Sequence, residues 1–263
     1  YYTLIPDQVF EQNLIDKGYD YTIDGQVLTI NIINIDSLSL NPIFGFGPGF
    51  GWGGWNSSAI NDLTGIEDFI NLTYLDCSGN QIDSLDFSQN PNLTYLNCSG
   101  LWFNRNLLSL NISQNTALTH LDCNSNLLSV LDLSQNTNLT FLNCRDNELQ
   151  ILDLSQNIGL VNLDCGNDIW ESFDNTNQLT NLDLSQNINL TSINCYGNSL
   201  SNLDLRNGNN TNIGYFNSGN NNSLYCISVD DSSWATANLT ISNQTIFSNN
   251  CNNLQYTLSL IHI

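Results

Sequence analysis

LTFLNCRDNELQILDLSQ, residues 139–156, is the stretch that decides the fold, because most of the chain consists of copies of it. A copy approximates Leu-x-x-Leu-x-Cys-x-x-Asn-x-Leu followed by x-x-Leu-Asp-Leu-Ser-Gln-Asn. The steps between successive copies are 21, 25, 21, 21 and 30 residues. Because a fixed period of this length is typical of stacked repeats, the sequence predicts a repeat solenoid. The copies begin at Leu72, Leu93, Leu118, Leu139, Leu160 and Leu190.

Each 21-residue unit is expected to contain two nested turns of 10 to 11 residues, each with its own Leu-x-Leu strand and its own asparagine. The leucines and cysteines face inward, and stacking of neighbouring coils supplies the burial that one repeat lacks. The asparagine amides are expected to bond backbone groups at the turns. The first-half asparagines are Asn80, Asn126, Asn147, Asn177 and Asn198, and the second-half asparagines are Asn90, Asn115, Asn136, Asn157 and Asn187.

Three regions follow from this pattern. Residues 1–71 form an N-terminal cap with irregular first coils, 72–212 form the repeats, and 213–263 form a degenerate repeat and a C-terminal cap. Residues 6–17 are expected to form a small helical cap, with Val9, Phe10, Leu14 and Ile15 as its apolar stripe. Spacings of two and three within residues 27–40 predict two short strands joined by a tight bend, and the tail from residue 254 alternates like a last strand.

Insertions interrupt the regular step at three places. Residues 41–58 combine six glycines with five large aromatic residues, and shorter insertions follow residue 100 and residue 167. Such a segment either packs onto the flank of the solenoid or presents a contact for a partner or a second copy of the chain. The aromatic residues concerned are Phe44, Phe46, Phe50, Trp52, Trp55, Trp102, Phe103 and Trp170.

The charge balance limits the classes of partner that the chain can bind. Four basic residues stand against 25 acidic ones, for a formal net charge of -21, so the chain should repel nucleic acid and anionic membranes. No apolar run approaches the ~20 residues of a transmembrane helix. The sequence begins at Tyr1 and has no Met, which predicts a processed, soluble chain. Several Asn-x-Ser/Thr triplets predict exposed positions and a glycoprotein.

The eight cysteines fall into two groups. Cys226 and Cys251 lie beyond the last good copy and form either a disulfide or two free buried thiols. The other six occupy the sixth position of a repeat and are expected to fill the core: Cys77, Cys98, Cys123, Cys144, Cys165 and Cys195.

The LDLSQNTNLTFLNC-type units resemble leucine-rich repeats, and more narrowly the nested units, called IRREKO repeats, of secreted leucine-rich repeat proteins of Bacteroidota. IPDQVFEQNLIDKGYD, DGQVLT and INDLTGIEDFINLTYLDC are similar to that family's N-terminal module, and LYCISVDDSSWATANLT with FSNNC to its C-terminal cap. The resemblance implies a leucine-rich repeat fold of short parallel strands and turns, with a parallel β-helix-like coil as the alternative. It also implies a secreted or cell-surface location and favours a Cys226–Cys251 disulfide.

Two rows of side chains should point outward, because residues alternate across a strand. The first row, the aromatic strip, would suit a protein hot spot or carbohydrate stacking, or would only stabilise its own strands. The second row, the acidic ladder, would either bind calcium or, as we favour, be solvated and bond backbone amides at the following turn. The strip comprises Tyr74, Tyr95, His120, Phe141, Asp76, Asp122 and Asp164, and the ladder comprises Asp86, Asp132, Asp153, Asp183 and Asp204.

No catalytic site is expected. Every rung offers similar carboxylates, and nothing gives two of them the distinct environments that an acid and a base require. The cysteines lack zinc-ligand spacing, and no phosphate loop is present. The sequence therefore predicts an extracellular, non-enzymatic protein without a required cofactor, which adheres to proteins or glycans at a cell surface. The alternative is a self-assembling subunit of an extracellular filament or surface layer, joined through the insertions.

Overall fold

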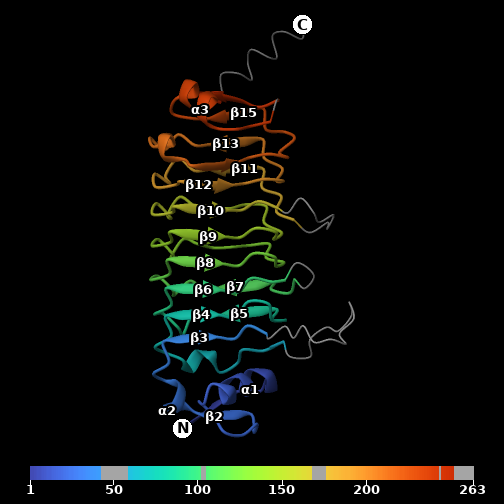
Figure 1. The fold of residues 1–263 in the computed structure, drawn as a ribbon, viewed down its shortest axis with the longest axis vertical. Coiled ribbons are helices and arrows are strands. Elements are labelled where there is room, and N and C mark those ends of the chain that lie inside the picture. The colour runs from blue at the N-terminus through green and yellow to red at the C-terminus, as the bar shows by residue number, and fades with distance from the viewer. Residues whose placement is uncertain (43–58, 102–104, 168–175, 243, 252–263) are drawn as a thin grey trace. The chain divides into compact units, whose positions relative to one another are not determined.

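The computed structural model describes residues 1–42, 59–101, 105–167, 176–242 and 244–251. The chain divides into two compact units, Tyr1–Leu128 and Ser129–Ile263. In each unit short strands stack in parallel as coils of a β-solenoid (Figure 1), which confirms the predicted fold class. The predicted contacts in the insertions, from Phe44 to Trp55, at Trp102 and Phe103, and at Trp170, lie outside the described residues, as does the expected last strand.

In the first unit, β3, β4, β6 and β8 form one parallel ladder and β5 pairs with β7 in a second. An antiparallel pair, β1 with β2, belongs to the N-terminal cap. The elements are β1 (Tyr2–Leu4), α1 (Gln8–Asp16), β2 (Gln26–Leu28), α2 (Thr29–Ile32), β3 (Ser37–Ser39), η1 (Ile66–Asp68), β4 (Tyr74–Asp76), β5 (Ser84–Asp86), β6 (Tyr95–Asn97), β7 (Ser109–Asn111) and β8 (His120–Asp122).

The second unit repeats this plan with a ladder of β9, β10, β12 and β14 and a ladder of β11, β13, β15 and β16, all parallel. The elements are β9 (Phe141–Asn143), β10 (Asn162–Asp164), β11 (Asn181–Asp183), β12 (Ser192–Asn194), β13 (Asn202–Asp204), η2 (Asn210–Asn212), β14 (Tyr215–Asn217), β15 (Cys226–Ser228), α3 (Ser232–Asn238) and β16 (Ile246–Ser248).

Two local expectations were wrong. The Leu-x-Leu segments 131–133 and 152–154 are not strands, although their leucines are buried, so side-chain burial holds these turns without a strand. The bend within residues 27–40 is a full helical turn, α2. The C-terminal cap contains a helix, α3, for which the sequence analysis offers no expectation; the Asp231 side chain begins it by accepting hydrogen bonds from Ser233 N and Trp234 N at 2.9 and 3.1 Å.

The N-terminal cap is fixed by two acidic side chains. Asp7 begins α1 by accepting hydrogen bonds from Val9 N and Phe10 N at 2.8 and 3.0 Å. Glu11 is fully buried, and its Oε1 accepts hydrogen bonds from three successive backbone amides, at residues 24 to 26. The helical periodicity predicts the burial of Phe10 and Leu14 but gives no sign of this buried carboxylate, because its partners lie in a turn distant in sequence.

The two asparagine columns are bonded differently. Asn198 uses both ends of its amide: Oδ1 accepts from Leu179 N at 3.0 Å, and Nδ2 donates to Cys165 O and Cys195 O. Asn187 in the second column donates to Leu154 O and Asn157 O, but its buried Oδ1 has no partner. The two columns therefore use the side-chain Nδ2 group alike, as expected, but they differ at the side-chain Oδ1 atom.

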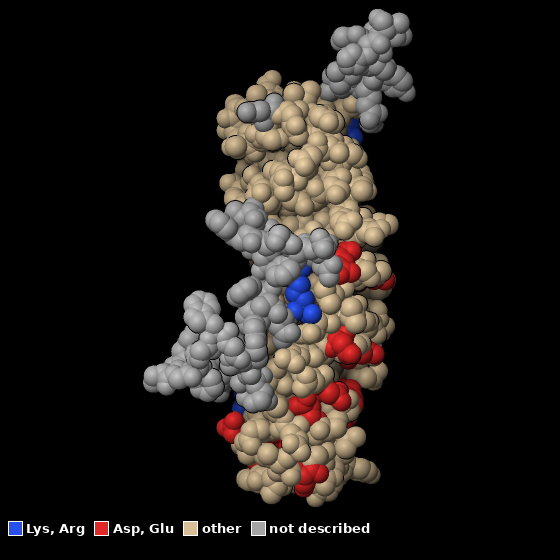
Figure 2. All heavy atoms as spheres, turned by 90° about the vertical axis from the view of Figure 1, so that its right-hand side faces the viewer, with Lys and Arg blue, Asp and Glu red and all other residues tan. Residues whose placement is uncertain are grey.

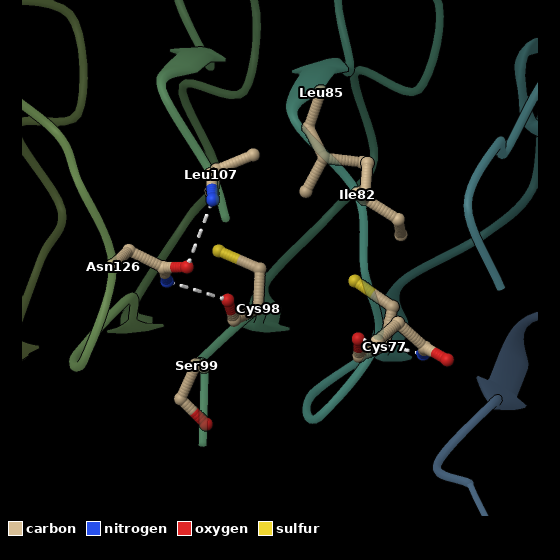
Figure 3. Close-up of a pocket in the computed structure, with 9 residues that line it drawn as sticks. Cys77, Ile82, Leu85, Cys98, Ser99, Leu107 and Asn126 are labelled. Carbon is tan, nitrogen blue, oxygen red and sulfur yellow. Dashed lines mark hydrogen bonds between the residues drawn. The ribbon is translucent and has the colours of Figure 1, made fainter. Parts of the chain in front are cut away.

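The six repeat cysteines are buried thiols that form no disulfide, and burial raises the pKa of Cys77 and of Cys195 to about 12. A cavity of about 10 Å³, the space of roughly one water molecule, lies beside Cys77 and Cys98 (Figure 3). Asn126 borders this cavity and bonds Leu107 N and Cys98 O. Several residues that line the cavity, among them Cys98 and Leu107, belong to the copy that is followed by the 25-residue step.

The C-terminal cap contains a disulfide. Cys226 and Cys251 are joined with a Cα–Cα separation of 5.8 Å and close a loop spanning 25 residues in sequence. The loop includes α3 and β16, so the link holds β16, the last described strand of its ladder, close to β15.

Candidate surface for protein recognition

The aromatic strip forms a continuous stack in the first unit. Register places Tyr74, Tyr95 and His120 on successive rungs of β4, β6 and β8. The Tyr74 and Tyr95 ring centroids are 4.4 Å apart at 14°, and those of Tyr95 and His120 are 4.2 Å apart at 11°. Parallel strands stand ~4.8 Å apart, so flat side chains on adjacent rungs meet face to face. The stack follows directly from the register.

Stacking changes what this surface offers. Both faces of the Tyr95 ring are covered by its neighbours, so a sugar ring has no face of Tyr95 on which to stack. Tyr95 presents instead its edge and hydroxyl group. Burial, reinforced by the nearby Tyr74 and Asp76, raises the pKa of Tyr95. Burial also lowers the pKa of His120, against the opposing effect of Asp122, so the neutral imidazole is favoured. These properties suit recognition by shape and hydrogen bonding.

Beside the rings, acidic and amide side chains alternate from rung to rung. In the first unit Asp76, Asn97 and Asp122 are in register, so the two carboxylates are separated by an amide. In the second unit Asn194 donates to both oxygens of Asp164, at 3.0 and 3.1 Å. Each outward Asp or Asn also accepts a hydrogen bond from a backbone amide two residues on, as Asp76 does from Ser78 N. The alternation relieves repulsion between carboxylates.

The acidic ladder uses the same local bond. Its five members, Asp86, Asp132, Asp153, Asp183 and Asp204, each accept a hydrogen bond from the backbone amide two residues on, at 2.9 to 3.0 Å. These bonds lower the pKa of Asp132 and of Asp153. One oxygen of each carboxylate is thus engaged at the turn.

Arg206 neutralises the end of this ladder. Asp183 and Asp204 are directly opposite on β11 and β13, and Arg206 Nε donates to Asp204 Oδ1 at 2.9 Å while its Nη2 reaches Oδ2. This bond lowers the pKa of Asp204. Where two carboxylates face each other in register, the chain supplies its own guanidinium group.

The remaining surface is poor in basic charge. On the face that Figure 2 shows, carboxylates are set among uncharged side chains and basic side chains are few. In the described part of the chain, no three His, Cys, Asp or Glu residues gather as metal ligands would. The helices of that same part are too short or too polar to span a lipid bilayer.

Two residues of the aromatic strip, Phe141 and Asp164, belong to the second unit, on β9 and β10. There Asn162 pairs in register with Phe141.

Comparison with known proteins shows which class of fold the chain has. No family model and no curated protein sequence matches the chain. Among solved structures, internalin C2 of Listeria monocytogenes is 18% identical with a TM-score of 0.59, over 93% of this chain and 94% of the internalin. Internalin F of the same organism is 20% identical with a TM-score of 0.54, over 93% and 68%. This chain has a leucine-rich repeat fold.

A third similar structure is the functional domain of InlJ from Listeria monocytogenes, which includes a cysteine ladder. It is 25% identical with a TM-score of 0.30, over 94% of this chain and 70% of that domain.

Proposed function

We propose that this chain is a secreted leucine-rich repeat protein of the Bacteroidota type that works outside the cell as a non-enzymatic adhesion module and binds a protein partner through the aromatic strip. The observation that carries the proposal is the stack of Tyr74, Tyr95 and His120, a pre-formed group of aromatic edges beside carboxylates and amides. Aromatic residues held rigidly among polar neighbours are typical of interface hot spots.

Protein recognition is favoured over glycan adhesion by the ring geometry. Carbohydrate stacking requires open ring faces, whereas both faces of the middle ring, Tyr95, are covered at 4.2 to 4.4 Å and at most an outer face of the stack remains. The partly exposed edges, with two phenol hydroxyl groups and an imidazole, suit hydrogen bonds to a polypeptide.

The test compares binding of three proteins to arrays of immobilised proteins and glycans. The strip variant replaces Tyr74, Tyr95 and His120 by Ser, the residue that β12 carries at the same outward place as Ser192. The control variant replaces Val130 and Ile151 by Ser, which removes exposed apolar side chains elsewhere. We expect the strip variant to lose its protein partners and the control variant to retain them. Unchanged binding by the strip variant, or binding to glycans alone, would refute the proposal.

Self-assembly through the insertions is a separate hypothesis, and the residues that would carry it lie outside the described ranges. Light scattering of concentrated protein tests it: monodisperse monomers would exclude a filament or surface layer, whereas large assemblies lost on deletion of residues 43–55 would favour one.

A further inference from the structure

The aromatic stack has an end. Tyr74 pairs in register with Ser37 on β3, and β3 is the last strand of its ladder. Ser37 is exposed and has no ring. Among the residues that the structure describes, Tyr74 therefore stacks on Tyr95 alone. The second face of the Tyr74 ring lies on the side of Ser37, whose side chain is a small hydroxymethyl group. Unlike Tyr95, Tyr74 has a ring face on which a flat ligand group could stack.

Two acidic residues belong to the segments that form this end of the ladder. Asp76 points outward on the same strand as Tyr74, two residues further on, and it is only partly exposed. Asp36 is exposed immediately before β3, and its backbone carbonyl accepts a hydrogen bond from Tyr74 N at 3.0 Å. No Lys or Arg occurs in β3, β4, β6 or β8. A ligand stacked on Tyr74 thus meets negative charge that no residue of these strands neutralises.

The chain itself shows which group binds one of its outward carboxylates. Arg206 donates two hydrogen bonds to the carboxylate of Asp204, and Asp204 pairs in register with Asp183. A guanidinium group is planar, stays charged, and stacks on aromatic faces as well as bonding carboxylates. At Tyr74 the carboxylates and an aromatic face are both present, but the guanidinium group is missing from the strands that form the surface.

We propose that Tyr74 is a stacking platform for an arginine side chain of the partner protein, with Asp76 as its charge partner, so that the partner docks through a basic extended segment. This assignment rests on the proposed protein-binding function and specifies the chemistry of the partner. A basic partner also fits a chain whose formal net charge is -21, because opposite charges speed and orient association.

The probes are three unstructured peptides that alternate Ser with Arg, with Lys or with citrulline, the last being nearly isosteric with Arg but uncharged. Binding is followed by fluorescence anisotropy, and stacking by the arginine Hδ resonances in NMR. We expect the Arg peptide to bind most tightly and to weaken with added salt. Its Hδ protons should shift upfield, because they lie over an aromatic ring. Equal affinity for the citrulline peptide would overturn the proposal.

Matched variants locate the site. Tyr74→Ser should weaken the Arg peptide about threefold, whereas Tyr74→Phe retains the ring and should bind as wild type. Asp76→Asn keeps the acceptor for Ser78 N, as Asn97 does for the next rung, so a loss of binding there reports charge and not misfolding. Asp153→Asn makes the same exchange on the acidic ladder and should have no effect. No loss with Tyr74→Ser, or no upfield shift, would refute the platform.

The two proposals fail in different ways. If the Ser variant of the strip loses its protein partners while Tyr74→Ser binds the Arg peptide like wild type, the arginine platform is wrong and the protein-binding role stands. If the strip variant keeps its partners on the array, the proposed function is wrong whatever the peptides show.

Discussion

The two asparagine columns provide a sharp test of how the solenoid is stabilised. Asn198 and Asn187 are both buried, 6% and 0% exposed, and each donates two hydrogen bonds to backbone carbonyls. They differ at the amide oxygen. Asn198 Oδ1 accepts from the buried Leu179 N–H at 3.0 Å, whereas Asn187 Oδ1 has no partner. The same substitution, Asn→Ala, at the two sites therefore isolates one hydrogen bond.

Both Ala variants lose two bonds to carbonyls, at about 1 kcal/mol each. Asn198→Ala also strands the Leu179 N–H, at a further cost of about 1–3 kcal/mol for a buried unsatisfied donor. Asn187→Ala strands no donor and removes an oxygen that is already unsatisfied. We expect losses in unfolding free energy of about 4 kcal/mol for Asn198→Ala and about 2 kcal/mol for Asn187→Ala.

Urea unfolding measures the two losses, and amide hydrogen exchange at Leu179 reports the local bond directly. Exchange at Leu179 should accelerate more in Asn198→Ala than in Asn187→Ala. A third variant, Asn187→Asp, places a carboxylate against Leu154 O and Asn157 O and should cost more than Asn187→Ala. Equal losses in the two Ala variants would refute the reasoning, because they would mean that Asn187 Oδ1 is satisfied by a buried water.

Three further outcomes are expected. Asp153→Asn keeps the acceptor for Ser155 N and should leave stability unchanged, with or without a calcium chelator, whereas Asp153→Ala should cost about 0.5–1 kcal/mol in urea unfolding. Because the pKa of Asp153 is lowered in the folded protein, its carboxylate contributes fully to the free energy of unfolding above about pH 4, and this contribution is lost at lower pH. The Asp153→Asn variant should not show this loss. Replacing Cys226 and Cys251 by Ser should lower unfolding free energy by about 3 kcal/mol in the chain-entropy model, as calorimetry can check. Because the pKa of Cys77 is about 12, its thiol should resist thiol reagents at pH 8 until the protein unfolds, and its stabilising contribution should fall as pH rises from about 9 to 12.

The repeat predicts the ladders well because one pattern satisfies two requirements at once. A Leu-x-Leu segment buries alternate side chains, and the 21-residue step returns the chain to the same register. Tyr74, Tyr95 and His120 therefore had to be outward neighbours, and the structure adds the distances and angles of their stacking. Repetition alone cannot separate Asn187 from Asn198, because the difference lies in whether a backbone N–H of an adjacent coil faces the amide oxygen.

Features outside the repeat were harder to predict. Glu11 occupies a position that reads as one polar residue of a helix, yet it is buried because three amides of a turn converge on its Oε1. The open face of Tyr74 depends on which strand follows β4 in space, and that strand, β3, is separated from it by an insertion. Periodicity predicts contacts between equivalent rungs, but the place where a ladder stops is set by the irregular coil that ends it.

The ~4.8 Å spacing between rungs explains why this end matters. Within a ladder the spacing brings equivalent side chains into contact, so rings cover rings and amides bond carboxylates, as Tyr95 and Asn194 do. Such contacts stabilise the surface, but the ring faces and polar atoms that take part in them are no longer available to a ligand. Only where the equivalent residue changes character, as from Tyr74 to Ser37, is a face left for a ligand. In a leucine-rich repeat protein with so regular a core, binding specificity should therefore be concentrated at breaks in its outward columns, and Tyr74 marks one of them.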